Sequence, residues 1–497
     1  MGGAMERDPG LPIKLEPCSN TEYDPPPMSA VTREAIRRAR RLTEENARKL
    51  GLSRREFLLS SMGAATTLGV LSACSRAAGA GNGGYYDVPE EATLESDAAQ
   101  GMLRRRQPII DVQTHLLEYP EDMVGTGLIA ALFAAGRDCG NLDPNDCFRT
   151  DRWLEEIFGL SQTTMAVISS LPVPPGDNDP LSPEHMDQAR EQVEEICDGE
   201  ARVLVQGHGQ PNFGNLEAFF DRMEAETDTY DLAAWKSYTH VGSGWSLDDS
   251  DQEGQPVGEA YLTKIEDLHA EGRGPDILCV HKGFSVVGTA DPRFALANDV
   301  GPAARNHPNL RFCIYHSGYE PGVEEGPYDP DNPNAGIDLL IKSLQDNGIG
   351  PGSNVYAELG TTWRSVMTEN NMDQAAHVLG KLLLYFGEDR ILWGTDSIWY
   401  GSPQDQIDAF RTFQISKQFQ QEFGYPKLKP KVKDKIFWRN AAELHGIDAY
   451  RLECDVTDPE DVEEARRTTP LGNWTYGPRT AAMSRRAFFR SHPWAVR

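Results

Sequence analysis

Short apolar runs recur from residue 108 onward, and segments with the spacing of amphipathic helices separate them. The runs predict strands at 108–115, 164–173, 202–208, 232–240, 277–283, 310–317, 354–361 and 391–397. Helices are expected at about 186–198, 214–225, 258–272, 292–306, 336–347, 372–386 and 403–414. Strands that alternate with helices in this way favour an α/β fold of the (β/α)8 TIM barrel type over an open doubly wound sheet. No G-x-G-x-x-G turn and no P-loop follows a strand.

Polar residues stand at or near the C-terminal ends of several predicted strands. They are His115, Lys236 to His240, His281, His316 and Asp396. In the first strand, Asp111, Gln113 and His115 occupy alternate positions, so their side chains project to one face. Active sites of TIM barrels lie at the C-terminal ends of the strands, so the barrel gathers these residues around one mouth.

Histidine and carboxylate side chains in one site favour a divalent metal ion such as zinc. A metal at the barrel mouth lowers the pKa of water and polarises a carbonyl group, while a nearby His or Asp moves the proton. The chain contains no Cys-x-x-Cys motif, so a zinc site built on thiolates is not expected. Cys279 and Cys313 lie in apolar runs and are expected to be buried thiols, whereas a bridge between Cys139 and Cys147 is left open.

Residues 1–32 are rich in Pro, Gly and acids, a composition typical of disorder, and Arg33 to Lys49 form a basic run, so we assign 1–52 to a disordered and basic leader. The pair Arg54-Arg55 precedes a mildly apolar segment of small residues, as in a twin-arginine export signal, which we place at 53–80. The apolar segment is too short and too rich in small residues for a good membrane span. Residues 81–107 are expected to form a Gly/Ala-rich tether.

The stretch Leu71-Ser72-Ala73-Cys74 resembles a lipobox, in which Cys74 is lipidated after cleavage. Simple cleavage near Ala77 to Ala80 is the alternative. Both readings predict export by the twin-arginine route to the periplasm or the outer cell surface, and the first adds a lipid anchor.

The chain has 497 residues, with 48 Lys and Arg against 76 Asp and Glu, and its formal net charge is -28. Such a surface repels nucleic acid and anionic lipid, so neither is an expected partner. Residues 448–497 read as an Asp/Arg-rich C-terminal extension that either packs on the barrel or mediates formation of a homo-oligomer.

Motifs within 108–447 carry a resemblance to a known family. They are Ile110-Asp-Val-Gln-Thr-His115, Val280-His281, Asn306-His-Pro-Asn-Leu310 leading to His316-Ser-Gly318, Arg390-Ile-Leu-Trp-Gly-Thr-Asp396 and Lys435-Ile-Phe-Trp-Arg-Asn440. In this order and spacing they resemble the amidohydrolase-related family of metal-dependent TIM-barrel enzymes, in the branch that contains aminocarboxymuconate-semialdehyde decarboxylase.

The resemblance implies that His115, His281 and Asp396 bind one divalent metal ion, with zinc as the expected metal. It also implies that His316 acts on water or substrate and that Asp396 relays a proton. The first family motif is usually His-x-His, and this chain has Gln113 at its first position. A neutral amide oxygen is a weaker zinc ligand than imidazole, so Gln113 is expected to contribute weakly.

Further candidates for binding a small-molecule substrate are Lys236, His240, Trp245, Trp363 and Trp399. In some amidohydrolases a carbamylated lysine at the fourth strand bridges two metals; the alternative for Lys236 is that it binds a substrate carboxylate or pairs with an acid. The tryptophans follow strand ends, where they either stack on a ring-shaped substrate or pack in the core.

The first functional hypothesis is a metal-dependent hydrolase that acts on a C–O or C–N bond of a small, cyclic and carboxylated compound. Asp396 would take the proton of the attacking water. The alternative is a non-oxidative, metal-dependent decarboxylase, a carbon–carbon lyase on the same scaffold. A third hypothesis is a metal-free surface binding protein, for which Gln113 is the main argument.

Overall fold

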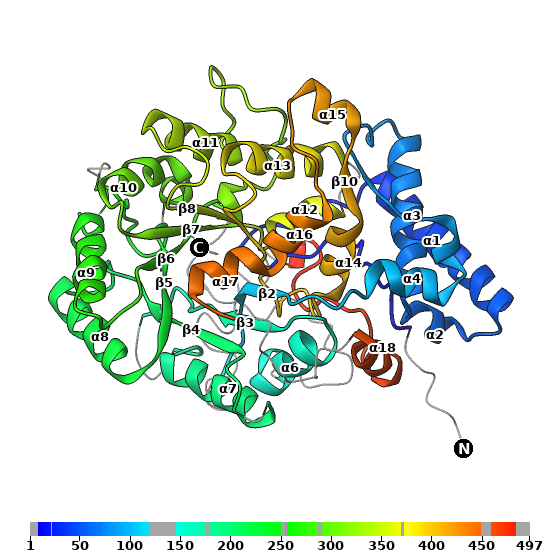
Figure 1. Cartoon of the computed structure of the whole chain (residues 1–497), viewed down its shortest axis with the longest axis horizontal. Helices are drawn as coiled ribbons and strands as arrows, with labels where there is room; N and C mark the ends of the chain where they lie inside the picture. The colour runs from blue at the N-terminus through cyan, green and yellow to red at the C-terminus, as the bar shows by residue number, and fades with distance from the viewer. Residues whose placement is uncertain are drawn as a thin grey trace.

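The computed structural model describes most of the chain, and its overall arrangement is shown in Figure 1. The described residues are 8–20, 22–118, 146–174, 179–197, 199–249, 254, 256–285, 291–368, 372–448 and 459–483.

Eight parallel strands form the central sheet, in the order of the chain. They are β2 (Ile110–Thr114), β3 (Met165–Ile168), β4 (Val203–His208), β5 (Leu232–Tyr238), β6 (Ile277–His281), β7 (Arg311–Tyr315), β8 (Val355–Glu358) and β9 (Ile391–Leu392). The sheet closes because the backbone N–H of Val112 donates to Trp393 O at 3.0 Å and that of His115 donates to Ser397 O at 2.6 Å. Every predicted strand is present, and the predicted barrel is confirmed.

Helices surround the sheet between successive strands, and most lie where the sequence predicts them (Figure 1). They are α7 (Pro183–Ile196), α8 (Leu216–Thr229), α9 (Gly258–Ala270), α10 (Val300–Asn306), α11 (Ile337–Asp346), α12 (Thr362–Met367), α13 (Met372–Tyr385), α14 (Gln404–Thr412), α16 (Pro430–Asp434) and α17 (Asn440–His445). Side chains of Ser182 and Asn215 cap the first turns of α7 and α8, which explains where these helices begin. The helix predicted at 292–306 is broken into the 3-10 turns η5 (Pro292–Ala295) and η6 (Ala297–Asp299) before α10.

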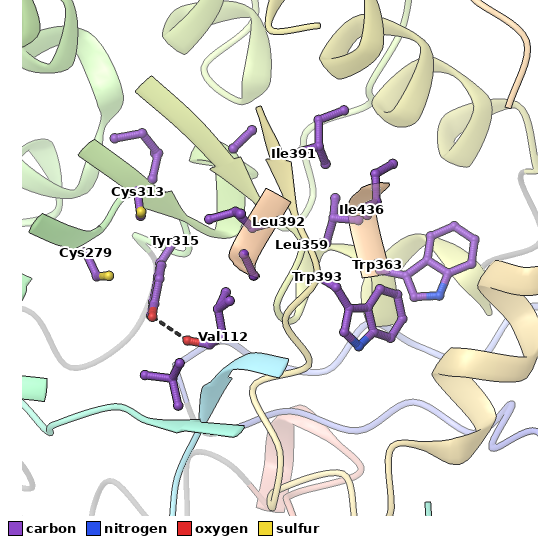
Figure 2. Close-up of a cluster of buried hydrophobic side chains, with 14 of the residues drawn as sticks. Val112, Cys279, Cys313, Tyr315, Leu359, Trp363, Ile391, Leu392, Trp393 and Ile436 are labelled. Carbon is purple, nitrogen blue, oxygen red and sulfur yellow. Dashed lines mark hydrogen bonds between the residues drawn. The ribbon is translucent and has the colours of Figure 1, made fainter. Parts of the chain in front are cut away.

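The strand interiors meet helix side chains in one apolar core, part of which Figure 2 shows. Cys279 and Cys313 are buried free thiols there, as predicted. Beside them Tyr315 donates its hydroxyl to the backbone oxygen of Val112, across the barrel (Figure 2). Buried side chains that hydrogen-bond in this way keep strands β2 and β7 in a fixed relation below the mouth.

A cluster of helices from the N-terminal region lies beside the barrel (Figure 1). It comprises α1 (Ala30–Leu50), α2 (Arg54–Leu58), α3 (Ser61–Ala77) and α4 (Ser96–Leu103). The region predicted as a tether differs from the prediction, because β1 (Gly84–Tyr86) pairs antiparallel with β10 (Phe413–Ile415) and Tyr86 is buried against Phe413. No helix in the described part of the chain is long and apolar enough to span a membrane.

The first described residues are packed against the barrel, so the prediction of disorder does not hold for 8–20. Leu11, Ile13 and Leu15 alternate along this stretch and are buried. Between them the ammonium group of Lys14 donates to the backbone oxygens of Tyr400 and Ser402, each at 2.6 Å. The Pro- and acid-rich composition suggested disorder, but burial of these apolar side chains against the rest of the chain stabilises an ordered path.

The C-terminal extension packs on the same side of the barrel. After α18 (Pro459–Thr468), the backbone N–H of Asn473 donates to Pro9 O at 2.6 Å. The N–H of Ser19 donates to Pro478 O at 2.9 Å, so the two ends of the described chain hold each other. Two further buried cysteines, Cys147 and Cys197, are disulfide-bonded. Cys139, which the sequence allows as a partner of Cys147, lies outside the described residues.

Candidate active site

The polar residues predicted at the strand ends gather at one mouth of the barrel. His115 follows β2 and Asp396 follows β9, and His115 Nε2 lies 3.1 Å from Asp396 Oδ1. His281 ends β6 and His316 follows β7, and their ring centroids are 4.5 Å apart. Each of these four side chains is at most 2% exposed, so the site is a buried cluster and the predicted gathering of residues is correct.

Three histidines of the cluster are each oriented by a backbone carbonyl. His115 Nδ1 lies 2.8 Å from Ser169 O, and His316 Nδ1 lies 2.8 Å from Gly360 O. His281 uses its other nitrogen, Nε2, which lies 3.0 Å from Gly283 O. Because a carbonyl only accepts, the nitrogen facing it carries the proton. The second nitrogen bears a lone pair in the neutral rings of His281 and His316, whereas that of His115 faces the carboxylate of Asp396. This arrangement is typical of metal-ligating histidines.

Asp396 receives hydrogen bonds on both carboxylate oxygens. Its Oδ1 accepts from Gln113 Nε2 at 3.1 Å, and its Oδ2 accepts from Thr361 Oγ1 at 2.6 Å and from Asn20 Nδ2 at 2.7 Å. Burial alone would raise the pKa of Asp396, but the hydrogen bond and charge of His115, with the other donors, lower it below its usual range. Asp396 is therefore the ionised group of the cluster.

Burial also sets the charge of the histidines. It lowers the pKa of His316 to about 4 and that of His240 to about 3, and it lowers the pKa of His281 well below the usual value, with neighbouring cationic groups acting in the same direction. These imidazoles are neutral near pH 7. Neutral imidazole is the form that binds a metal ion.

Gln113 faces the same cluster from β2. Besides its bond to Asp396, its Nε2 lies 3.4 Å from His316 Nε2, while its Oε1 is buried without a hydrogen-bond partner. A buried amide oxygen left without a donor carries a free-energy cost unless a cation or water satisfies it.

Lys236 and His240 come from the end of β5. The Lys236 ammonium group has no hydrogen-bond partner and lies over the rings of Tyr315 and Tyr238, at 3.9 and 4.5 Å from their centroids. Burial lowers the pKa of Lys236 to about 8. His240 lies with its ring centroid 4.6 Å from that of His281, so both side chains reach the cluster from one strand.

The donor set fits a divalent metal ion. Among the described residues, one group of three potential ligands has its ligand atoms within 4.8 Å of one another, and it consists of Glu22, His281 and His316. His115 and Asp396 lie next to this group. His115 Nε2 faces Asp396 Oδ1, so a proton or a cation is needed between these two atoms as well.

The tryptophans divide between the site and the core. The Trp399 ring centroid lies 5.8 Å from that of His115, so Trp399 borders the cluster. Trp363 instead donates to Gln406 O and packs on Phe410, and Trp245 packs on Tyr261, with both indoles fully buried. The structure therefore does not bring Trp245 and Trp363 to the site expected for them, because their rings turn toward the helix layer and complete its packing.

Several residues of the site were not predicted. Glu358 ends β8, accepts the backbone N–H groups of His316 and Gly360, and has a pKa that burial raises to about 8. A side chain at Gly394 would collide with Glu358, since a Cβ there would lie 1.7 Å from Glu358 Oε1. The only signal for Glu358 in the sequence is an acid inside the apolar run predicted as the strand 354–361.

Asn20 and Glu22 reach the cluster from the N-terminal segment, which we define as residues 8–20 and 22–28. Nothing in the sequence pattern indicated this. Glu22 Oε1 lies 3.5 Å from His281 Nδ1, and burial together with the charge of Asp396 raises the pKa of Glu22 to about 8. A cavity of about 440 Å³ lies on the outer side of this segment, lined by Tyr23 and Tyr319 among others, and none of the four clustered His and Asp side chains lines it.

Comparison with known proteins gives a match over most of the barrel. A family model described as Amidohydrolase (Amidohydro_2) matches residues 110–447. No curated protein matches the chain.

Solved structures of similar fold include an uncharacterized TIM-barrel protein from Bordetella bronchiseptica, which is 14% identical with a TM-score of 0.40 over 69% of this chain and 100% of that one. They also include 5-carboxyvanillate decarboxylase from Sphingomonas paucimobilis, at 12% identity and a TM-score of 0.36 over 69% and 99% of the two chains. A dihydroorotase from Saccharomyces cerevisiae is 11% identical, with a TM-score of 0.37 over 70% and 86%.

Proposed function

The chain belongs to the amidohydrolase family, and from this premise we propose that it is a metal-dependent hydrolase. Its substrate class is a small, carboxylated compound with a cyclic ester or amide bond. The metal is one divalent ion, with zinc as the first candidate because the donors are imidazole nitrogen and carboxylate oxygen.

The observation that carries this proposal is the orientation of the three histidines. His115, His281 and His316 each give one ring nitrogen to a backbone carbonyl, so in the neutral rings of His281 and His316 the other nitrogen is fixed as an acceptor. Burying acceptors with no donor between them is costly. A divalent cation would satisfy these two nitrogens together, since their ligand atoms lie within 4.8 Å of each other.

The residues of the chain have distinct roles in this proposal. Asp396 is ionised and lies within reach of His115 and Thr361, so it accepts the proton of the attacking water. His316 is neutral, and its free nitrogen would bind the ion together with that of His281. Lys236 offers a buried ammonium group without a hydrogen-bond partner, which suits a substrate carboxylate. A bound divalent metal would supply the Lewis acidity that polarises the carbonyl and activates water.

The test begins with metal content. Full-length protein, stripped by a chelator and reloaded with zinc, is expected to hold about one ion per chain, the number of a three-ligand catalytic site. His281→Ala should lose it. A panel of carboxylated lactones and cyclic amides then tests hydrolysis, with incorporation of oxygen from labelled water as the readout. Retention of all activity after removal of every ion would contradict the metal-dependent mechanism, and binding of panel compounds without turnover would favour a metal-free binding protein.

A non-oxidative decarboxylase is the second candidate, and the observation that favours it is the burial of the cluster. His281, His316 and Lys236 are fully buried, and loss of carbon dioxide from a carboxylate is easier away from water. Hydroxybenzoates in the same panel test this candidate. Release of carbon dioxide without uptake of labelled oxygen would favour it over hydrolysis.

We also propose export by the twin-arginine route. Arg54-Arg55 before a small-residue apolar segment supports it, and so do the disulfide bonds of Cys147 and Cys197, which are typical of oxidising compartments. The lipid anchor on Cys74 predicted from the sequence needs a cleavage that would remove Asn20 and Glu22, so we propose export with the N-terminal residues retained. Mass spectrometry of the exported protein tests this, and a mature chain that begins at Cys74 or after Ala80 would contradict it.

A further inference from the structure

The N-terminal segment crosses the mouth of the barrel and places two polar side chains in the buried cluster. Its turn is held locally, because Tyr23 OH donates to Cys18 O at 2.7 Å and Ser19 Oγ donates to Tyr23 O at 2.5 Å. The Tyr23 ring packs on Phe284, with centroids 5.2 Å apart, and Phe284 in turn contacts the ring of His316. The turn is therefore fixed against residues of the site itself.

Asn20 ties this turn to the ionised carboxylate of the barrel. Its amide nitrogen donates to Asp396 Oδ2 at 2.7 Å and to Glu22 Oε2 at 2.6 Å. With Oε2 occupied in this way, the other carboxylate oxygen, Oε1, points toward His281. The side chain of Glu22 is 30% exposed, whereas that of His281 is fully buried.

The pair formed by Glu22 and His281 lacks a donor. His281 Nε2 carries its proton toward Gly283 O, so Nδ1 presents a lone pair. This atom is buried without a hydrogen-bond partner, and the nearest carboxylate oxygen, Glu22 Oε1, lies 3.5 Å away. Two acceptors that face each other need a proton or a metal ion between them.

We propose that Glu22 is a metal ligand, which completes with His281 and His316 a site whose anionic donor comes from outside the barrel. The proposal rests on the metal-dependent function above and deepens it. It also explains how the site can tolerate Gln113 in place of the usual histidine, because the carboxylate of Glu22 supplies a stronger metal ligand than the neutral amide on β2. The same ion then fastens the N-terminal segment over the mouth.

The first test measures zinc affinity of the full-length chain by competition with a chelating dye. Glu22→Gln keeps the size of the side chain and its hydrogen bonds but removes the charge, and it should weaken zinc binding at least about tenfold. Glu16→Gln is the matched control, because Glu16 lies in the same segment with its side chain 45% exposed and 3.6 Å from Arg479. Its affinity should equal that of the unmodified chain.

His281→Ala distinguishes a failure of the Glu22 proposal from a failure of the proposed metal-dependent function. If His281→Ala loses zinc while Glu22→Gln binds it as tightly as the unmodified chain, Glu22 is not a ligand, only a proton lies between it and His281, and the proposed function still stands. If neither variant changes the affinity, the metal site itself is wrong and both proposals fall.

The second test measures hydrogen exchange of backbone amides in the N-terminal segment. The backbone N–H of Glu22 is bonded to Asn20 Oδ1 at 3.0 Å and that of Ser19 to Pro478 O. Zinc should slow exchange of these amides in the unmodified chain and leave their exchange unchanged in Glu22→Gln. Equal exchange with and without zinc in the unmodified chain would overturn the proposal.

Discussion

The Nε2 atom of His115 and the Oδ1 atom of Asp396 lie 3.1 Å apart, so the first and last strands of the barrel meet through these two side chains. Their positions are nearly 300 residues apart in the sequence, and closure of the sheet brings them together. A carboxylate in such contact with histidine is held ionised, which is the state a proton acceptor needs.

Asp396→Asn is expected to lower kcat at least about a hundredfold, the range seen when a general base is lost. The backbone at Asp396 has a φ of +57°, and Asn is among the few residues that adopt this conformation readily, so the fold should survive. Steady-state kinetics measures kcat, and circular dichroism shows whether the fold survives. Asp389→Asn, at an acid whose side chain is 53% exposed, is the control; turnover of Asp396→Asn close to that of this control would remove the catalytic role.

Gln113→His should tighten zinc binding, by about tenfold or more, because it adds an imidazole on the strand face that carries His115. The amide oxygen of Gln113 has no hydrogen-bond partner, so its loss leaves no new buried donor unpaired. Competition with a chelating dye gives the affinity. Gln113→Leu is the control for shape, and an equal gain in that variant would show that the imidazole does not reach the metal.

Lys236→Met should leave about one zinc ion per chain, since a single three-ligand site needs no bridging lysine. Because the Lys236 ammonium group is buried without a hydrogen-bond partner, its removal should also raise Tm. The KM of a carboxylated substrate should rise about tenfold, while an analogue with a neutral amide in place of the carboxylate is unaffected. Two tightly bound ions in the unmodified chain, reduced to one in Lys236→Met, would instead identify a bridging ligand.

Lys433, which lies outside the candidate active site, should make the free energy of unfolding depend on pH. Burial lowers its pKa from 10.5 to about 7, so between these values the unfolded chain binds a proton that the folded chain does not. The free energy of unfolding should therefore rise with pH from about 7 to about 10.5, and this contribution should be absent in Lys433→Met.

Urea unfolding of both proteins at pH 7 and pH 9 measures the effect of Lys433. Lys433→Met also loses the hydrogen bonds to Arg411 O and Phe413 O. The test therefore compares the change in unfolding free energy between the two pH values, and not its absolute value, in each protein. A difference between the two proteins that is the same at both pH values would show that Lys433 stays charged in the fold.

Replacing Arg54 and Arg55 together by Lys should leave precursor in the cytoplasm, because the twin-arginine route requires the arginine pair. The same double replacement at Arg40 and Arg41 of α1 is the control, since it changes a pair of arginines outside the motif. Immunoblots of cell fractions give the distribution. Normal export of the first variant would exclude this route.

The barrel and the core of its site could be predicted because their signals are local. Apolar runs mark the strands, and the polar residue that ends each run, such as His281 or Asp396, is brought to the mouth by the barrel geometry itself. No comparable geometric rule predicts where a side chain just beyond a strand end points. Trp399 therefore lies beside His115, whereas Trp363 lies in the core.

The path of the N-terminal segment could not be predicted for a different reason. Asn20 contacts Asp396 across 376 positions of sequence, and no periodicity encodes a contact of that span. The composition around Pro25 to Pro27 is typical of a disordered leader. Its order comes from partners elsewhere in the chain, which a reading of the segment alone does not contain.

The hydrogen bonds that join Pro9 to Asn473 and Ser19 to Pro478 also bear on the order in which the chain folds during synthesis. During synthesis the N-terminal segment emerges first, and the C-terminal residues that bond to it emerge last. Its contacts with Asp396 and Tyr400 can form before these final bonds. The last residues of the chain therefore complete the attachment of the first.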